Sequence, residues 1–158
     1  MFSWLKPSPF PDPQLGELVR SRGHWRGTIT LGARTAPLAV NGNRGGPDSR
    51  ALQMARSLSS EFSAWKHVVE IALFGHYKQH AEALTAGAAP VTREQLPEIE
   101  KPSQVWPQVT LAFVSVSPLD GELTAELGYD TAWDEEHTLG ARFQDGQFIE
   151  LCGSVVPS

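Results

Sequence analysis

Two groups of titratable side chains carry the chemistry that this sequence offers, and the denser group is the run Trp133-Asp134-Glu135-Glu136-His137. Crowded carboxylates raise one another's pKa, so a histidine beside them is a typical arrangement for acid–base chemistry. Glu135, Glu136 and His137 are therefore the candidate catalytic residues of a small acid–base or metal-dependent hydrolase. The alternative is architectural: a charged turn joins two strands, and Trp133 anchors that turn in the core.

The second group is a pair of histidines on a predicted helix. His76 and His80 are four residues apart and share one helix face, which is the spacing of a two-histidine metal site. Zincins place a glutamate between two such histidines, whereas the residues between this pair include no carboxylate. His76 and His80 are thus a candidate metal pair that needs a third ligand, and the alternative is two polar side chains at a helix edge. We predict no cofactor.

The scaffold for these groups is predicted from hydrophobic periodicity. Alternating apolar residues predict strands within 24–40 and 109–152, and Asp145-Gly146 is typical of a hairpin turn. Apolar residues at helical spacing predict two helices, 48–58 and 61–85, because serines between them favour a break.

Together these elements predict the fold class and the domain organisation. We predict an α+β fold with a mainly antiparallel sheet, made of N-terminal strands and C-terminal strands, and two central helices packed on one face. Residues 1–14 are predicted to form a Pro-rich extended tail, and residues 15–158 a single α+β domain.

The charges are distributed unevenly along the chain. Its 158 residues are 41% hydrophobic and 20% charged, which excludes wholesale disorder, and the net charge is −5. Residues 1–90 carry 10 Lys and Arg against 6 acidic residues, while residues 91–158 carry 3 against 12. This balance argues against a nucleic-acid binder, although the N-terminal arginines leave a basic face as an alternative. The acidic half predicts a basic protein partner.

The location is predicted from what the sequence lacks. Cys152 is the single cysteine and cannot close an intrachain disulfide. No apolar run reaches the roughly 20 residues that span a bilayer, and prolines interrupt the first residues, where a secretory signal would need an apolar core. We predict a cytoplasmic protein without membrane contact.

The block from Trp133 to Gly140, followed by Arg142 and the Asp145-Gly146 turn, resembles the signature of a bacterial family of unknown function. Its members share Trp, Asp, Glu or Pro, Glu, His, a gap of two residues and Gly. The resemblance spans about residues 15–155. Small acidic domains of this kind occur near contact-dependent toxins, so the resemblance implies an immunity-like protein.

These observations predict a non-enzymatic bacterial protein-binding domain, of the kind in which an immunity or accessory protein neutralises a partner. The hydrolase described above is the alternative. The predicted binding residues come from the family-like block and the arginine after it: Trp133, Asp134, Glu135, Glu136, His137 and Arg142.

Overall fold

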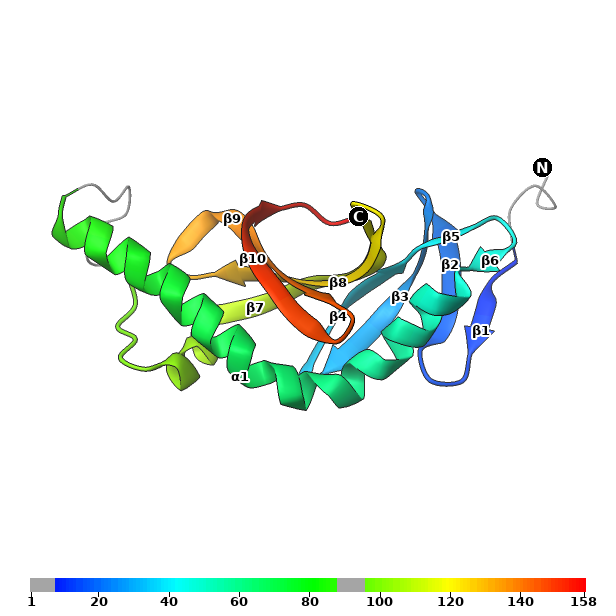
Figure 1. Cartoon of the computed structure of the whole chain (residues 1–158), viewed down its shortest axis with the longest axis horizontal. Coiled ribbons are helices and arrows are strands. Elements are labelled where there is room, and N and C mark those ends of the chain that lie inside the picture. The colour runs from blue at the N-terminus through cyan, green and yellow to red at the C-terminus, as the bar shows by residue number, and fades with distance from the viewer. Residues whose placement is uncertain (1–7, 88–95) are drawn as a thin grey trace.

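The structure is a computed structural model that describes residues 8–87 and 96–158. An eight-stranded sheet, in the order β1-β2-β3-β4-β7-β8-β9-β10, packs against one long helix, α1 (Figure 1). A two-stranded ribbon, β5-β6, leads into the helix, and a short 3-10 helix, η2, follows it. The elements are β1 Phe10–Asp12, β2 Gly16–Ser21, β3 His24–Leu31, β4 Arg34–Val40, β5 Gly42–Asn43, β6 Gly46–Pro47, α1 Ser49–Thr85, η2 Pro102–Gln108, β7 Val109–Leu119, β8 Glu122–Thr131, β9 Asp134–Gln144 and β10 Gln147–Val155.

The predicted pair of central helices is wrong, because α1 runs unbroken through residues 59–61. The serines that suggested a break satisfy their hydroxyls without interrupting the helix: Ser57, Ser60 and Ser63 donate to carbonyls three residues earlier, and Ser59 donates to the carbonyl of Thr30. The apolar stripe also continues across this point, since Leu58 and Phe62 are both buried. One continuous helix therefore buries more apolar surface than two broken ones.

The sheet is mixed, which the predicted fold class also missed. β4 and β7 pair in parallel, while the other neighbours pair antiparallel. The parallel pair follows from the connection, because α1 and η2 carry the chain back to the edge from which β4 started. The predicted α+β fold with two helices on a mainly antiparallel sheet is thus corrected to a large mixed sheet with one long helix.

The strand order keeps the two halves of the sequence apart. β1 to β4 form one side of the sheet and β7 to β10 the other, with no strand of one half inserted into the other (Figure 1). The charge asymmetry is therefore kept between the two sides of the sheet, while α1, which belongs to the first half, packs across both sides.

Side-chain parity in the C-terminal strands places the core between the sheet and α1. In β8, Ala125, Leu127 and Tyr129 are buried on the helix side, as their alternation predicts. The predicted hairpin turn at Asp145-Gly146 is confirmed: both residues have positive φ, 52° and 76°, and they join β9 to β10.

The end of the predicted tail forms part of the sheet edge. β1 pairs with β2, and the buried carboxylate of Asp12 accepts hydrogen bonds from the guanidinium of Arg56 on α1. The first seven residues of that tail lie outside the described residues. Among the residues that are described, no helix has both the length and the apolar character needed to cross a membrane.

Candidate functional site

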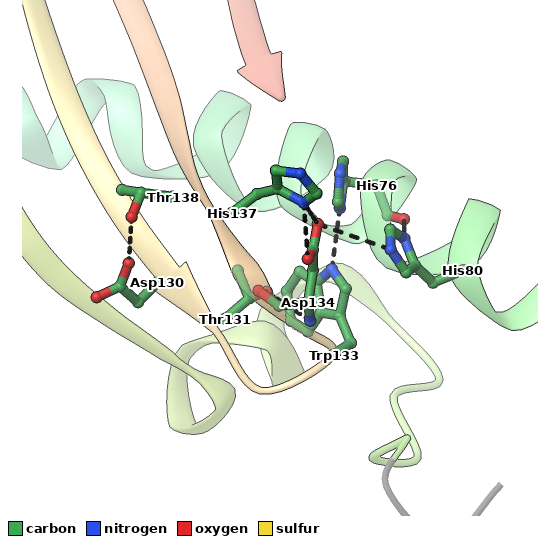
Figure 2. A network of polar contacts seen from close by, with 8 residues as sticks. All are labelled: His76, His80, Asp130, Thr131, Trp133, Asp134, His137 and Thr138. Atoms are coloured by element: carbon green, nitrogen blue, oxygen red, sulfur yellow. Dashed lines mark hydrogen bonds and ion pairs between the residues drawn. The ribbon is translucent and has the colours of Figure 1, made fainter. Parts of the chain in front are cut away.

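The two groups of titratable residues that the sequence singled out meet in one polar network. His76 and His80 lie on the C-terminal half of α1, and Asp134 and His137 lie at the start of β9 (Figure 2). His76 and Trp133 are 57 residues apart in the chain, and the turn between β8 and β9 brings strand and helix into contact. The network is referred to below as the histidine cluster, defined as His76, His80, Asp134 and His137.

Trp133 connects this cluster to the core. It sits in the two-residue turn between Thr131 and Asp134, yet its side chain is completely buried. Its indole Nε1 donates to Nδ1 of His76 at 3.0 Å, and its ring meets the Tyr77 ring edge-on at 5.6 Å between centroids. The turn is therefore pinned beneath α1 by an aromatic contact and a hydrogen bond.

The contact with Trp133 defines the protonation of His76. An indole N–H can only donate, so Nδ1 of His76 must be the unprotonated, accepting nitrogen of a neutral ring. Burial lowers the pKa of His76, and the neighbouring His80 lowers it further, while Asp134 acts in the opposite direction. The geometry and the direction of the pKa shift agree on a neutral His76.

Asp134 is the centre of the charged part of the cluster. Its side chain is only 10% exposed, and its two carboxylate oxygens lie 3.0 and 3.1 Å from Nδ1 of His137. Nε2 of His80 lies 3.7 Å from the same carboxylate, and Nδ1 of His80 donates to the carbonyl of His76 at 3.3 Å. The amide of Asp134 donates to the Thr131 hydroxyl, which fixes the turn from the strand side.

The cluster contains an Asp–His pair of the kind used in acid–base chemistry, but the carboxylate is Asp134 and not the predicted Glu135 or Glu136. Asp134 holds Nδ1 of His137 and leaves Nε2 of that half-exposed ring as a proton acceptor, the relationship found in catalytic Asp–His pairs. Glu135 and Glu136 are exposed. Within the described residues, neither glutamate side chain makes a hydrogen bond or ion pair. The histidine thus pairs with Asp134 and with neither glutamate.

Asp134 lies beside the candidate metal pair His76 and His80, but the described residues do not complete a set of metal ligands. The rings of His76 and His80 are tilted by 34° with their centroids 4.7 Å apart, and Nδ1 of His76 already accepts the hydrogen bond from the indole of Trp133. In the part of the chain that the structure describes, no group of three or more His, Cys, Asp or Glu side chains is arranged to hold a metal ion.

Arg142, the remaining predicted binding residue, lies apart from the cluster. It follows the opposite parity in β9 from the buried residues Ala141 and Phe143, and so points to the face of the sheet away from α1. There its guanidinium contacts Glu126 at 2.5 Å and Glu150 at 2.9 Å, and the hydrogen bond that it donates to Glu126 is the main reason that its pKa is raised.

The sequence singled out the members of the cluster but not their contacts. It grouped His137 with Glu135 and Glu136 because they are neighbours in the chain, and it offered His76 and His80 as a metal pair that needs a third ligand. Tyr77, which packs against Trp133, was missed as a site residue because it reads as one more apolar position of the helix. No signal in a single sequence links residues 76 and 133.

A glutamine at position 76 is expected to flatten the dependence of stability on pH. Because the folded-state pKa of His76 lies below its unfolded value near 6.5, the unfolded chain takes up the proton first, so stability is full above pH 6.5 and falls below it. In His76→Gln the amide oxygen still accepts from Trp133 but does not titrate. Urea unfolding at pH 7.5 and pH 5.5 measures the difference.

The control for that experiment is His67→Gln, since the His67 side chain is 79% exposed on the same helix. This variant is expected to lose as much stability between the two pH values as the wild type. If His76→Gln loses as much stability between the two pH values as the wild type does, another titratable group is responsible for the loss.

Comparisons with known proteins agree with the predicted membership of a family of unknown function. No curated protein and no solved structure matches the chain. One family model matches residues 14–155, a range that includes β2 to β10, the long helix and the whole histidine cluster. The chain therefore belongs to the family described as Domain of unknown function (DUF6985).

Proposed function

We propose that this domain binds a basic partner protein through its acidic end and has no catalytic activity of its own. The acidic end is the part of the molecule formed by the last turns of α1, the segment 96–101 and the β8–β9 turn. The observation that carries the proposal is the exposure of Glu135 and Glu136 at the start of β9, directly after a turn that is held in place by hydrogen bonds of Trp133 and Thr131.

The sheet order supports the proposal by concentrating acidic side chains there. Tyr77 ties segment 96–101 to α1, because its hydroxyl donates to the carbonyl of Pro97 and accepts from the amide of Ile99. The same ring contacts Trp133, so the three segments form one surface. Its basic residues are Lys78 and Lys101, and its acidic residues are Glu82, Glu98, Glu100, Asp130, Asp134, Glu135 and Glu136. Such an excess of negative charge steers a basic protein into contact.

The histidine cluster gives this surface a fixed shape. Asp134 is held by Thr131 and by two imidazoles, and Trp133 is locked under the helix. A preorganised loop loses little conformational entropy on binding, so its contacts contribute more fully to affinity. An Asp–His pair would serve a hydrolase equally well, but Glu135 and Glu136, which the hydrolase hypothesis requires beside His137, point to solvent.

The finer parts of the proposal concern biological context. We propose a bacterial, cytoplasmic protein that neutralises its partner in the manner of an immunity protein. The acidic end supports this assignment because occlusion of a basic surface, such as one that holds an anionic substrate, requires complementary charge and no chemistry from the inhibitor.

Reversing the side-chain charges of Glu135 and Glu136 is expected to abolish capture of the partner protein. Wild type and Glu135→Lys/Glu136→Lys are used as baits in lysate of the source organism at low salt, and bound proteins are quantified by mass spectrometry. A basic protein that is enriched on wild type should drop by about tenfold or more on the variant, since each reversal replaces an attraction with a repulsion. The enrichment should also fall as salt rises.

The matched control is Glu17→Lys/Glu122→Lys, which makes the same change in net charge at exposed positions away from the acidic end. This bait should capture as much of the partner as the wild type does. Proteins bound equally by all three baits would rule out the acidic end as the binding surface.

A further inference from the structure

A groove lies beside the N-terminal half of α1, away from the acidic end. It has a volume of about 510 Å³ and runs between the N-terminal half of α1 and strands β8 and β9. The tip of the β9–β10 hairpin lies beside the middle of the helix and closes one end (Figure 1). Cavities of this size are large enough to hold several side chains.

The floor of the groove is apolar and rigid. Trp65 stacks face to face on Phe143, with centroids 3.8 Å apart and planes 8° from parallel, and its Nε1 donates to the carbonyl of Gly146. Ala125 and Leu123 of β8 continue this floor toward the start of the helix. An apolar side chain placed here would be removed from water against an aromatic surface.

The helix wall of the groove is polar, which is unusual for a helix face turned toward a sheet. Arg50, Gln53, Ser57 and Glu61 recur at intervals of three and four residues and so form one stripe. Asp145 faces them from the hairpin turn. In the described part of the chain, the side chains of Arg50, Glu61 and Asp145 make no hydrogen bond or ion pair, so their charges are available to a ligand.

The charges are separated along the groove. Arg50 and Glu61 are eleven residues apart on the helix, which corresponds to about 16 Å along its axis. Asp145 adjoins Gly146, whose carbonyl binds Trp65 one turn beyond Glu61, so both carboxylates lie at the same end. The groove thus has a basic end, an apolar floor and an acidic end.

We propose that this groove binds a short extended peptide segment of a partner protein, with an acidic residue at one end, an apolar residue in the middle and a basic residue at the other. An extended chain advances about 3.3 Å per residue, so five residues and their side chains span the distance between the charges. Alternate side chains point the same way, so positions one, three and five all face the groove. The proposal rests on the proposed function and extends it: besides the acidic end, the groove would be a second contact with the partner, one that recognises the sequence of a segment.

The experiment uses three defined peptides and the full chain. The matched probe is acetyl-Glu-Ser-Leu-Ser-Arg-amide, and the reversed probe is acetyl-Arg-Ser-Leu-Ser-Glu-amide, in which the charged residues trade places along the chain. Binding is followed by the indole N–H resonance of Trp65 in ¹⁵N spectra, assigned with Trp65→Phe. Because an extended peptide can lie in either direction, the decisive comparison uses a neutral probe, acetyl-Gln-Ser-Leu-Ser-Gln-amide, which should bind about tenfold more weakly than both charged peptides.

Variants of the groove test the same point from the protein side. Arg50→Gln/Glu61→Gln removes the charges of the helix wall and should bring the affinity for the charged peptides close to that of the neutral one. Glu17→Gln/Arg22→Gln makes the same change at exposed positions outside both the groove and the acidic end, and should leave all affinities unchanged. Circular dichroism confirms that each variant is folded.

Equal binding of charged and neutral peptides, or no shift of the Trp65 resonance with any of them, would overturn the peptide proposal. Neither result bears on Glu135 and Glu136, which the groove variants leave intact. Conversely, a loss of capture by the acidic-end variant leaves the groove affinities unaffected, so the two proposals fail independently.

Discussion

Replacing Trp133 with alanine is expected to lower the free energy of unfolding by about 3–5 kcal/mol, the range for truncation of a fully buried large aromatic residue. The side chain is completely buried, packs against Tyr77 and donates to His76. Its removal leaves a cavity under the C-terminal half of α1 and an orphaned acceptor on the imidazole. Chemical unfolding followed by circular dichroism measures the loss.

Two further variants separate the causes of that loss. Trp133→Phe retains most of the apolar contact but loses the hydrogen bond to His76, so its cost should be smaller than that of the alanine variant. Trp106→Ala is the matched control, because Trp106 is partly exposed and packs at the edge of the core. A Trp133→Ala variant no less stable than Trp106→Ala would contradict the role of Trp133 as the anchor of the cluster.

Local patterns predicted the parts of the fold in which neighbouring residues determine the outcome. Alternation identified the helix-facing side of β8, including Ala125, Leu127 and Tyr129, because one strand face is buried and the other is not. Asp145-Gly146 identified its turn because a short polar residue followed by glycine tolerates positive φ at both positions.

The same local patterns wrongly predicted two helices where the chain forms one, α1. Serines disfavour helix interiors because their hydroxyls compete for main-chain groups. In α1 the hydroxyls bond within the helix, and that of Ser59 bonds to Thr30 of β3. The packing of Leu58 and Phe62 against the sheet outweighs the weak local preference, and this packing depends on strands that are distant in the sequence.

The candidate site shows the same limit. Chain proximity joined His137 to Glu135 and Glu136, but the β8–β9 ladder is irregular here and leaves residues 135–137 without partners in β8. Regular strand alternation therefore does not hold at this point, and His137 bonds to Asp134. The actual partners of the β8–β9 turn come from α1, through the contact of Trp133 with His76. Only the sheet order, with β4 parallel to β7, determines where the end of α1 meets that turn.

The face of the sheet opposite α1 supplies the second large effect, at Gly128. A bulge in β7 between Leu111 and Phe113 turns the Phe113 ring onto this face, directly over Gly128 of β8. A Cβ atom at position 128 would lie 2.1 Å from the Phe113 ring, far inside van der Waals contact. The backbone of Gly128 has no positive φ, so the constraint is one of space alone.

Gly128→Ala is therefore expected to destabilise the fold by about 1–3 kcal/mol, as overpacking of a well-filled site does, because Phe113 is only 3% exposed and has little room to move. A double-mutant cycle identifies the cause: in a Phe113→Ala background, the same glycine substitution should cost almost nothing, since the clashing ring is absent. Gly153→Ala in β10 is the matched control, because no atom lies within 4 Å of its added Cβ. Equal costs of Gly128→Ala in both backgrounds would show that the strand needs this glycine for a reason other than Phe113.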